Sequence, residues 1–459
     1  MSLLTQGNAR SLYTWVLYLL FFLSGATGLI YEIMWNRKLT LIFGSTVYSV
    51  TTILTVFFAG LALGAYLIGR RVDYIKSPLY LYIGLEFAIG LFGFASPLLF
   101  GAIDWSHSLL YPFLGDTPVR LTALRFALSF IALLIPTTLL GATLPVLVKL
   151  VAKNDAGVAE NAGRLYAVNS LGAALGTLLA ATSLIPLLGV NGSLYLTGFT
   201  NIAIAVSAWL VFKKEAREKA VQQPAARYFH SGIQKYILTL FGVAGFISMA
   251  YQVAWFRLLV QITGTSVYTF GLMLSIFIAG VGLGSAASTR LLPKIRSVVG
   301  MLVLVEILAS VYSLLSVSYF DSLPAFYVSL SLGLAGFSSE VFSPFFLELL
   351  SKAFIATIVF LIPTLMFGAA FPLVATVFAQ RSADSGRDVG VVYAVNTVGG
   401  VLGSFLGGFV FLPILGTQMT IAAMGVAGVL LAVAVAMPLA ERGMRIAAPV
   451  GGVVLVVLS

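Results

Sequence analysis

The sequence of 459 residues contains no cysteine and only two histidines, His107 and His230. The lack of cysteine excludes disulfide bonds, thiolate metal sites and cysteine nucleophiles. A metal site built from several imidazoles is not expected with so few histidines. Nor does the sequence show a nucleophile–base pair. We therefore predict no metal site, no bound cofactor and no catalytic residue in this chain.

Charged residues are also scarce. They make up 9% of the sequence, whereas ordinary soluble domains contain about 25%. Hydrophobic residues make up 60%, and the mean hydropathy is +1.04. Apolar runs of roughly 20 residues recur along the chain, and each is long enough to cross the ~30 Å core of a lipid bilayer. The composition indicates an all-α polytopic membrane protein.

The net charge of +10 would suit a nucleic-acid-binding protein. The lysines and arginines, however, are concentrated in every second loop between the apolar runs, and the other loops are neutral or acidic. This alternation follows the rule that positive loops stay on the cytoplasmic side. We predict no nucleic-acid partner, and a cytoplasmic N-terminus.

Most of the chain is an internal repeat. Tyr31, Trp35 and Arg37 recur 220 positions later as Tyr251, Trp255 and Arg257, and beyond a longer linker the offset becomes 227. Each copy contains six apolar spans. An even number of spans gives both copies the same orientation, as in the two halves of a major-facilitator transporter. We predict a major-facilitator-like bundle of about 12 transmembrane helices.

The repeat sets the expected boundaries. The first six-helix repeat covers 1–213, a cytoplasmic connector 214–235, and the second repeat 236–440. Residues 441–459 begin a further apolar run that is too short to cross a bilayer, so we predict an incomplete extra span there. Loops 102–119 and 319–352 are expected to be linkers between spans.

The run Gly28-Leu-Ile-Tyr31-Glu32-x-x-Trp35-x-Arg37, with Gly44–Tyr48 and the pair Gly60/Gly64, resembles the membrane part of bacterial fused major-facilitator/spermidine-synthase proteins. The resemblance implies the bacterial inner membrane and a cytoplasmic aminopropyltransferase-like domain as partner. This sequence contains no soluble α/β segment that could form that domain. The resemblance therefore does not assign an enzymatic activity to the chain.

Three carboxylates, Glu32, Glu86 and Glu306, lie inside apolar spans. A charged side chain there is costly and usually faces the bundle interior. Glu86 and Glu306 are repeat equivalents, whereas Glu32 corresponds to the neutral Gln252. We expect all three to border one central cavity on a substrate or ion pathway; the alternative is a structural salt bridge or a carboxylate reaching the interface.

Other polar and aromatic residues, including Gln252, are assigned to the same pathway. Tyr31 and Tyr251, with their tryptophan neighbours, suit an organic cation or form an aromatic belt at the outer interface. Asn169 and Asn396 either contact the substrate or connect helices through hydrogen bonds. Packing or hinge roles are expected for residues that let helices approach or bend: Gly60, Gly64, Gly280, Gly284, Pro136 and Pro363.

Arg37, Lys38 and Arg257 lie at predicted outer ends of spans, against the positive-inside rule. We therefore expect specific ion-pair or gating roles for them. Helical spacing makes Glu32 the first candidate partner of Arg37 or Lys38. Arg257 has no carboxylate at the matching place, and the 319–352 linker is its expected source of one.

Two functions follow from these patterns. The first is a secondary transporter that moves a small cationic, polyamine-like metabolite by alternating access of its two halves. The second is a membrane module that anchors, regulates or supplies substrate to a spermidine-synthase-like enzyme. The sequence leaves the substrate, the coupling ion and the direction of transport open.

Overall fold

The computed structural model describes residues 2–44, 47–114, 117–151, 158–218, 231–337, 342–379 and 385–440. Within these ranges every regular element is helical. The first repeat contains α1 (Ser2–Phe43), α2 (Val47–Val72), α3 (Pro78–Leu114), α4 (Pro118–Val151), α5 (Val158–Leu179) and α6 (Ile185–Glu218). The second contains α7 (Gly232–Thr263), α8 (Val267–Leu291), α9 (Val298–Val317), α10 (Leu323–Ala335), α11 (Pro344–Ala379), α12 (Ser385–Leu406) and α13 (Leu412–Ala440).

Ten helical segments in the described chain are long and apolar enough to cross a membrane. Two of them, Ala159–Lys213 and Gly386–Met437, are 55 and 52 residues long. A straight helix of that length would reach about 80 Å, more than twice the thickness of a bilayer core. Each is broken by a glycine with positive φ, Gly189 (φ 67°) and Gly416 (φ 73°), a conformation that glycine adopts without steric cost. Each segment therefore makes two crossings, and the predicted bundle of about twelve membrane helices is confirmed.

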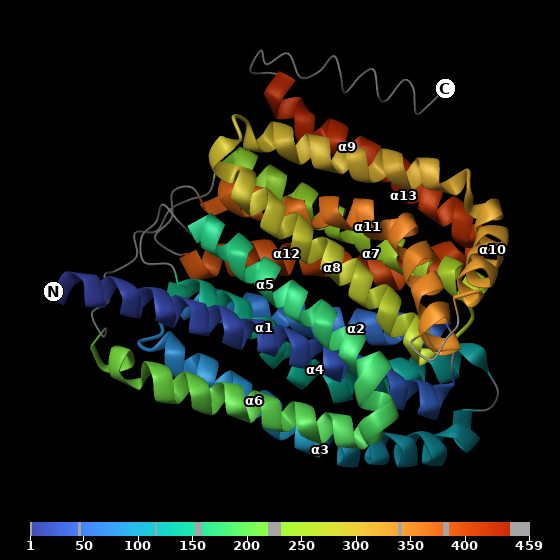
Figure 1. Ribbon diagram of the computed structural model, residues 1–459, viewed down its shortest axis with the longest axis horizontal. Coiled ribbons are helices and arrows are strands. Elements are labelled where there is room, and N and C mark those ends of the chain that lie inside the picture. The colour runs from blue at the N-terminus through green and yellow to red at the C-terminus, as the bar shows by residue number, and fades with distance from the viewer. Residues whose placement is uncertain are drawn as a thin grey trace.

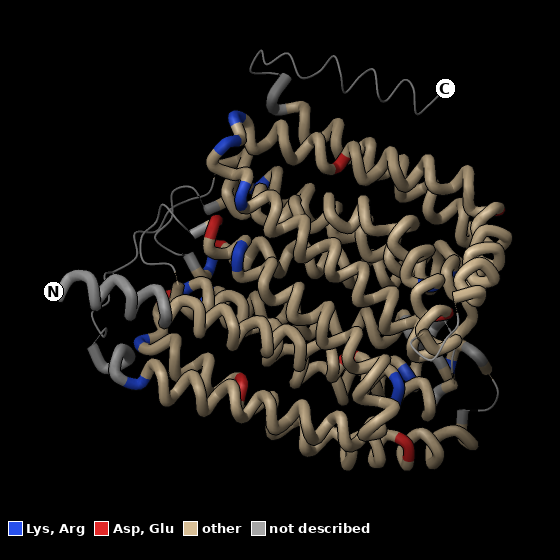
Figure 2. The backbone as a smooth tube through the Cα atoms, in the orientation of Figure 1, with Lys and Arg blue, Asp and Glu red and all other residues tan. Residues whose placement is uncertain are grey.

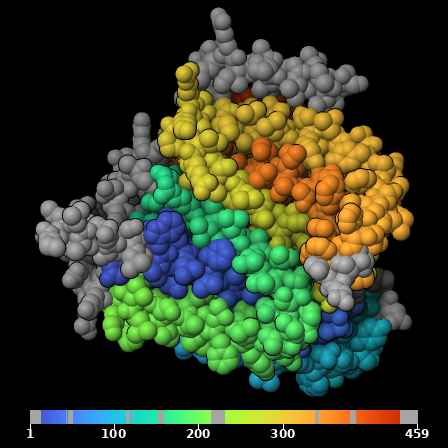
Figure 3. Space-filling model, in the orientation of Figure 1, coloured from blue at the N-terminus to red at the C-terminus, as the bar shows by residue number. Residues whose placement is uncertain are grey.

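The two repeats occupy separate halves of the bundle. In Figure 1 the blue-to-green helices α1–α6 lie below, and the yellow-to-red helices α7–α13 lie above. Figure 3 shows the same division on the surface in view. The halves meet where α2 packs on α12 and α5 packs on α8. Thr55 and Ser404 share a hydrogen bond of 3.1 Å across the first contact, and Ser275 donates to the carbonyl of Ala174 across the second.

Small residues bring helices of the same half close together. A Cβ added to Gly64 of α2 would lie 1.9 Å from the carbonyl oxygen of Thr138 in α4. Its repeat equivalent, Gly284 of α8, would lie 1.9 Å from the carbonyl oxygen of Leu365 in α11. A Cβ added to Gly60 or Gly280 would instead meet the side-chain hydroxyl of Thr137 (1.7 Å) or Thr364 (2.0 Å). These glycines therefore act in packing, because any side chain would force the backbones apart.

Two segments differ from the expected linkers. The third span continues as helix α3 to Leu114, and the 319–352 region contains the additional helix α10. Both segments are apolar enough to stay helical beyond the predicted spans. Pro136 and Pro363 lie inside α4 and α11. The expected extra span at 441–459 and most of the connector, 219–230, fall outside the described residues.

Basic residues gather at one end of the bundle, at the left of Figure 2. The last turns of α2, α4 and α8 carry Arg70, Arg71, Lys149 and Arg290. We call this the basic end. The opposite end is where α1 and α7 finish and where α2 and α8 begin.

Candidate functional site

A cavity of about 790 Å³ lies between the two halves at the opposite end. Its size falls within the range of about 300–1,000 Å³ that is usual for small-molecule sites. From α1 it is lined by Ile33, Asn36, Arg37 and Thr40, which share one helix face because they are three or four positions apart. The remaining lining residues come from the second half: Phe256, Arg257, Val260, Gln261, Thr265, Ser266, Val267, Phe270, Gly408, Leu412, Pro413, Gly416 and Thr417.

The cavity places two arginines from equivalent positions of the repeat around one space. Arg37 ends the repeated Tyr-x-x-x-Trp-x-Arg motif in α1 of the first half, and Arg257 ends it in α7 of the second half. The arginines are accompanied by neutral polar groups, including Asn36 and Gln261. No acidic residue occurs among the described residues that line this cavity. The large cavity is therefore positive in character.

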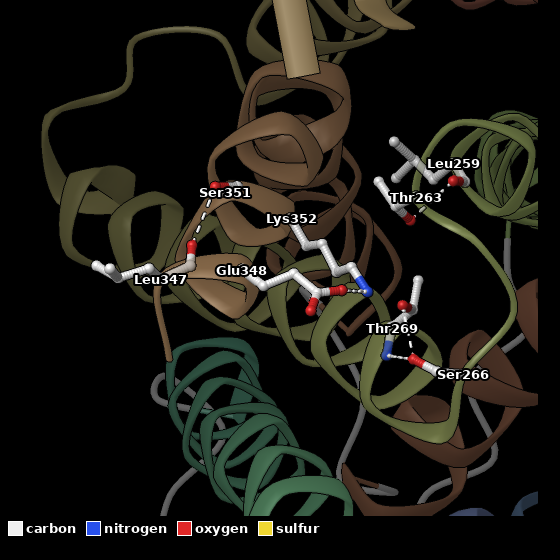
Figure 4. Close-up of polar contacts among 8 residues, drawn as sticks. All are labelled: Leu259, Thr263, Ser266, Thr269, Leu347, Glu348, Ser351 and Lys352. Atoms are coloured by element: carbon white, nitrogen blue, oxygen red, sulfur yellow. Dashed lines mark hydrogen bonds and ion pairs between the residues drawn. The ribbon is translucent and has the colours of Figure 1, made fainter. Parts of the chain in front are cut away.

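The ion pairs expected for these arginines are not formed within the described part of the chain. Glu32 pairs with neither Arg37 nor Lys38. Two linker acids that were candidates for Arg257 have other partners. Asp321 accepts a hydrogen bond from Gln418 (3.0 Å), and Glu348 pairs with Lys352 (2.7 Å; Figure 4). The third, Glu340, lies outside the described residues.

Figure 4 also shows how the rim of the cavity is fixed. Ser266, which lines the cavity, caps the start of α8 by accepting a hydrogen bond of 3.0 Å from the backbone N–H of Thr269. Such a cap satisfies a backbone donor that the helix itself leaves free. The cap holds this edge of the cavity in place.

The repeat-equivalent carboxylates Glu86 and Glu306 have different surroundings. Glu86 is fully buried within the first half, where its Oε1 accepts from Ser24 Oγ (2.6 Å) and its Oε2 accepts from Asn201 Nδ2 (2.7 Å). The same Asn201 amide also donates to Thr27 Oγ1 (3.1 Å). These bonds connect α1, α3 and α6, so Glu86 is a structural carboxylate.

Glu306 lacks both of those partners. At the positions that match Ser24 and Asn201 the second repeat carries Ala244 and Gly428. No hydrogen bond reaches the Glu306 carboxylate from any described residue. Instead, Glu306 lines a second cavity of about 90 Å³ between the halves. Its other lining groups include Tyr166 of the first half and Ser248, Tyr393 and Asn396 of the second.

The prediction that all three carboxylates border one cavity is wrong. Glu86 is enclosed in its hydrogen-bond network, and only Glu306 lines either of the two larger cavities among the described residues. Glu32 is 3% exposed, and its Oε1 has no hydrogen-bond partner in the described structure. It lies to one side of the α1 face that lines the large cavity. Its counterpart Gln252 borders a small apolar pocket of about 20 Å³.

The repeated aromatic pairs are buried inside each half. Tyr31 stacks on Trp35 with ring centroids 5.1 Å apart, and Tyr251 stacks on Trp255 at 4.7 Å. All four side chains are at most 1% exposed. The aromatic-belt interpretation is therefore wrong, because belt residues face the lipid interface. Neither tyrosine lines the larger cavities, and the side chain of Tyr48 lies outside the described residues.

The paired asparagines connect helices. Asn169 Nδ2 donates to the carbonyl of Phe21 (3.2 Å), which ties α5 to α1. Asn396 Nδ2 donates to the carbonyl of Phe241 (3.0 Å), which ties α12 to α7. Asn396 also borders the Glu306 cavity, whereas Asn169 lines neither cavity.

The basic end is closed by contacts between the halves. Asp73, in the turn after α2, pairs with Lys149 of α4 (2.9 Å) and accepts the backbone N–H of Arg387 at the start of α12 (2.8 Å). Tyr166 of α5 stacks on Phe371 of α11 with centroids 4.4 Å apart. The sequence alone does not reveal this role of Asp73, because the backbone group that it binds is 314 positions away.

One repeated feature beside the large cavity also went unrecognised. Helices α5 and α12 each end in a five-residue π-helix, Ala180–Leu184 and Gly407–Phe411, at matching positions of the repeat. The second borders the large cavity through Gly408. Such π-segments are frequent at functional sites, and no residue pattern in a single sequence identifies them reliably.

We expect Asp73→Asn to weaken closure of the basic end. The asparagine keeps the shape of the side chain but loses the ion pair with Lys149 and a charge-assisted bond to α12, which together are worth about 1.5–3 kcal/mol. Fluorescence distance measurements between labels on the basic ends of α4 and α12 check this. The average separation should increase relative to the unsubstituted chain. An unchanged distance would mean that Asp73 does not hold the halves together.

Comparisons with known proteins agree with the architecture. The chain is 14% identical to the human organic anion transporter MFSD10 over 92% of its length and 99% of that chain, with a TM-score of 0.55. A bacterial homologue of the iron transporter ferroportin, in its outward-facing state, is 14% identical over 93% of this chain and 99% of that chain, with a TM-score of 0.56. At these identities the likeness concerns the fold.

Sequence comparison gives a partial match. A polyamine aminopropyltransferase of Oceanobacillus iheyensis is 26% identical over 193 residues, which are 41% of this chain and 34% of that relative. The chain thus spans about a third of the relative that it matches. No protein-family model matches the chain. What the fold and the comparisons together establish is a multi-pass membrane protein with the all-helical, major-facilitator-like fold of membrane transporters.

Proposed function

We propose that this protein is a secondary transporter that moves a small metabolite by alternating access of its two halves. The observation that carries the proposal is the large cavity between the halves at one end, combined with closure of the basic end by Asp73 and by the stacked Tyr166 and Phe371. A cavity open to one side and blocked on the other is one state of a rocking bundle. The other state would open the basic end and close the large cavity.

The distribution of charge supports an orientation for this cycle. Because basic loops face the cytoplasm, the basic end is the inner side in our proposal. The structure then corresponds to an outward-facing state. The inner membrane of a bacterium, proposed from the sequence resemblance, would place the large cavity toward the periplasm.

Glu306 is the residue we propose for ion coupling. It is a carboxylate between the halves, without a hydrogen-bond partner in the described structure, whereas its equivalent Glu86 is fully bonded. An intramembrane carboxylate that faces a polar cavity is typical of proton and cation pathways. Because Glu306 has no counterpart of the hydrogen bonds that hold Glu86, its carboxylate is free to bind and release an ion during the cycle.

The polyamine-like substrate predicted from the sequence has support only from the name of the partly matching relative. The same match supports the second candidate, a membrane module for an aminopropyltransferase-like domain. The lining of the large cavity argues against a cation at that place, because it carries Arg37 and Arg257.

Alternating access is testable with single cysteines, because the chain has none of its own. We expect Thr265→Cys, in the large cavity, to react with an impermeant maleimide added from outside. Ser285→Cys, buried against Gly163 near the basic end, should be protected in this state. Adding Asp73→Asn should lower labelling at position 265 and raise it at 285. If labelling at both positions is unaffected by this change, the rocking mechanism fails and the membrane-module alternative is favoured.

A further inference from the structure

The large cavity has a chemistry that specifies the charge of its ligand. Its two charged lining groups are the guanidinium groups of Arg37 and Arg257, one from each half of the transporter. Neither arginine forms an ion pair with any described residue. Arg37 is half-buried and Arg257 is exposed to the cavity. Two positive charges directed into one space attract anions and repel cations.

The remaining lining residues indicate what else the ligand carries. Apolar side chains from both halves, Ile33, Phe256 and Phe270 among them, line the same space as the arginines. Neutral hydrogen-bonding groups are supplied by Asn36, Gln261 and Thr417. A bare inorganic ion would leave the apolar walls without contacts. An organic molecule that combines an apolar body with an anionic group matches both parts of the lining.

We propose that the cavity binds a small organic anion through a carboxylate or phosphate group held by Arg37 and Arg257. A guanidinium group presents a planar fork of donors that matches the oxygens of either anion. Because the two arginines belong to different halves, a bound anion connects the halves. Movement of one half against the other then changes the contacts on the anion, which is how binding is linked to the transport cycle.

This inference rests on the proposed transport function, so its test measures binding separately from transport. The purified full chain is titrated by calorimetry with phenylacetate, phenylphosphate, neutral phenylacetamide and spermidine. We expect one or both anions to bind, and the neutral amide and spermidine not to bind. A preference for phenylacetate or phenylphosphate identifies the anionic group as a carboxylate or a phosphate.

Substitutions locate the binding. Arg37→Gln and Arg257→Gln should each lower the affinity for the anion at least about tenfold, the effect of losing a charge-assisted contact. The anion affinity of Arg37→Lys should lie between those of the unsubstituted chain and Arg37→Gln, because lysine keeps the charge without the planar fork. Lys38→Gln is the matched control, since Lys38 adjoins Arg37 but does not line the cavity; it should bind as the unsubstituted chain does. Melting temperatures of the ligand-free variants verify that they are folded. If Arg37→Gln does not fold, the affinity of Arg257→Gln alone tests the site.

The possible failures are distinguishable. The proposed anion site is overturned if spermidine binds and neither anion does, or if no tested anion binds. It is also overturned if both glutamine variants bind the anion as tightly as the unsubstituted chain does. Anion binding that depends on both arginines, without uptake into proteoliposomes, leaves the site standing and overturns the transport function. Uptake of spermidine but of no anion overturns the anion site and leaves the transport function standing.

Discussion

Glu306→Gln is expected to abolish ion-driven uptake while leaving the protein folded. Glutamine has almost the same volume but cannot bind and release a proton or hold a cation through charge. Loss of one charge-assisted contact with the coupling ion is worth about 1.5–3 kcal/mol, or roughly ten- to hundredfold in affinity. Folding should be little affected, because the Glu306 carboxylate makes no hydrogen bond with described residues and faces a cavity.

Glu86→Gln is the matched control, since Glu86 is the repeat equivalent of Glu306. Its carboxylate accepts bonds from Ser24 and Asn201. The amide retains hydrogen-bonding groups but loses the negative charge, so we expect a lower melting temperature with uptake still driven by the gradient. The two substitutions should therefore have opposite effects on stability and transport.

The measurement uses proteoliposomes with the transported solute present both in the vesicle lumen and in the external medium. Under an imposed ion gradient, Glu306→Gln should accumulate no solute. With equal solute concentrations and no gradient, it should still exchange labelled for unlabelled solute, because binding and rocking remain possible. Gradient-driven accumulation equal to that of the unsubstituted chain would exclude Glu306 as the coupling residue.

The architecture was predictable because it depends on local and repeated properties. Apolar length determines each crossing, and the repeated Tyr31 and Tyr251 motifs reveal the duplication. The helical continuation of α3 to Leu114 was not predicted. In an apolar segment without a glycine break, composition alone does not tell where a helix leaves the membrane.

The site was less predictable, because its chemistry depends on residues far apart in the chain. Glu86 and Glu306 look alike in sequence, and their difference arises from Asn201 and its replacement Gly428. That replacement is visible when the repeats are aligned, so the signal was present but indirect. The hydrophobic run around Glu32 does not show which side of α1 faces the cavity, and this is why the predicted shared cavity was wrong.

Arg37 and Arg257 were identified from the sequence, but they were predicted to form ion pairs with acidic side chains. A charge in an apolar span implies a partner, and an acidic side chain was the natural candidate. The structure instead places both arginines around a space of about 790 Å³. Only the packing of α1 and α7 from opposite halves creates that space, and the spacing within either helix cannot reveal it.

A covalent link between the halves at the basic end is expected to stop transport completely and reversibly. Gly163 of α5 and Thr289 of α8 belong to different halves, and a Cβ on Gly163 would lie 2.3 Å from Thr289 Oγ1. Gly163→Cys combined with Thr289→Cys therefore places two sulfurs within bonding range after a small adjustment. The natural chain has no cysteine, so oxidation can join only this pair.

Oxidation of this double variant should reduce uptake to the level of empty vesicles, and a reducing agent should restore it, because the disulfide holds the basic end closed. Gly90→Cys with Ile202→Cys is the control. These residues lie on α3 and α6 of the same half, where a Cβ on Gly90 would be 2.8 Å from Ile202 Cγ1. A disulfide there moves with its half and should leave uptake nearly unchanged. Normal uptake by the oxidised Gly163–Thr289 pair, with the link verified by mass spectrometry, would show that the basic end need not open and that the halves do not rock.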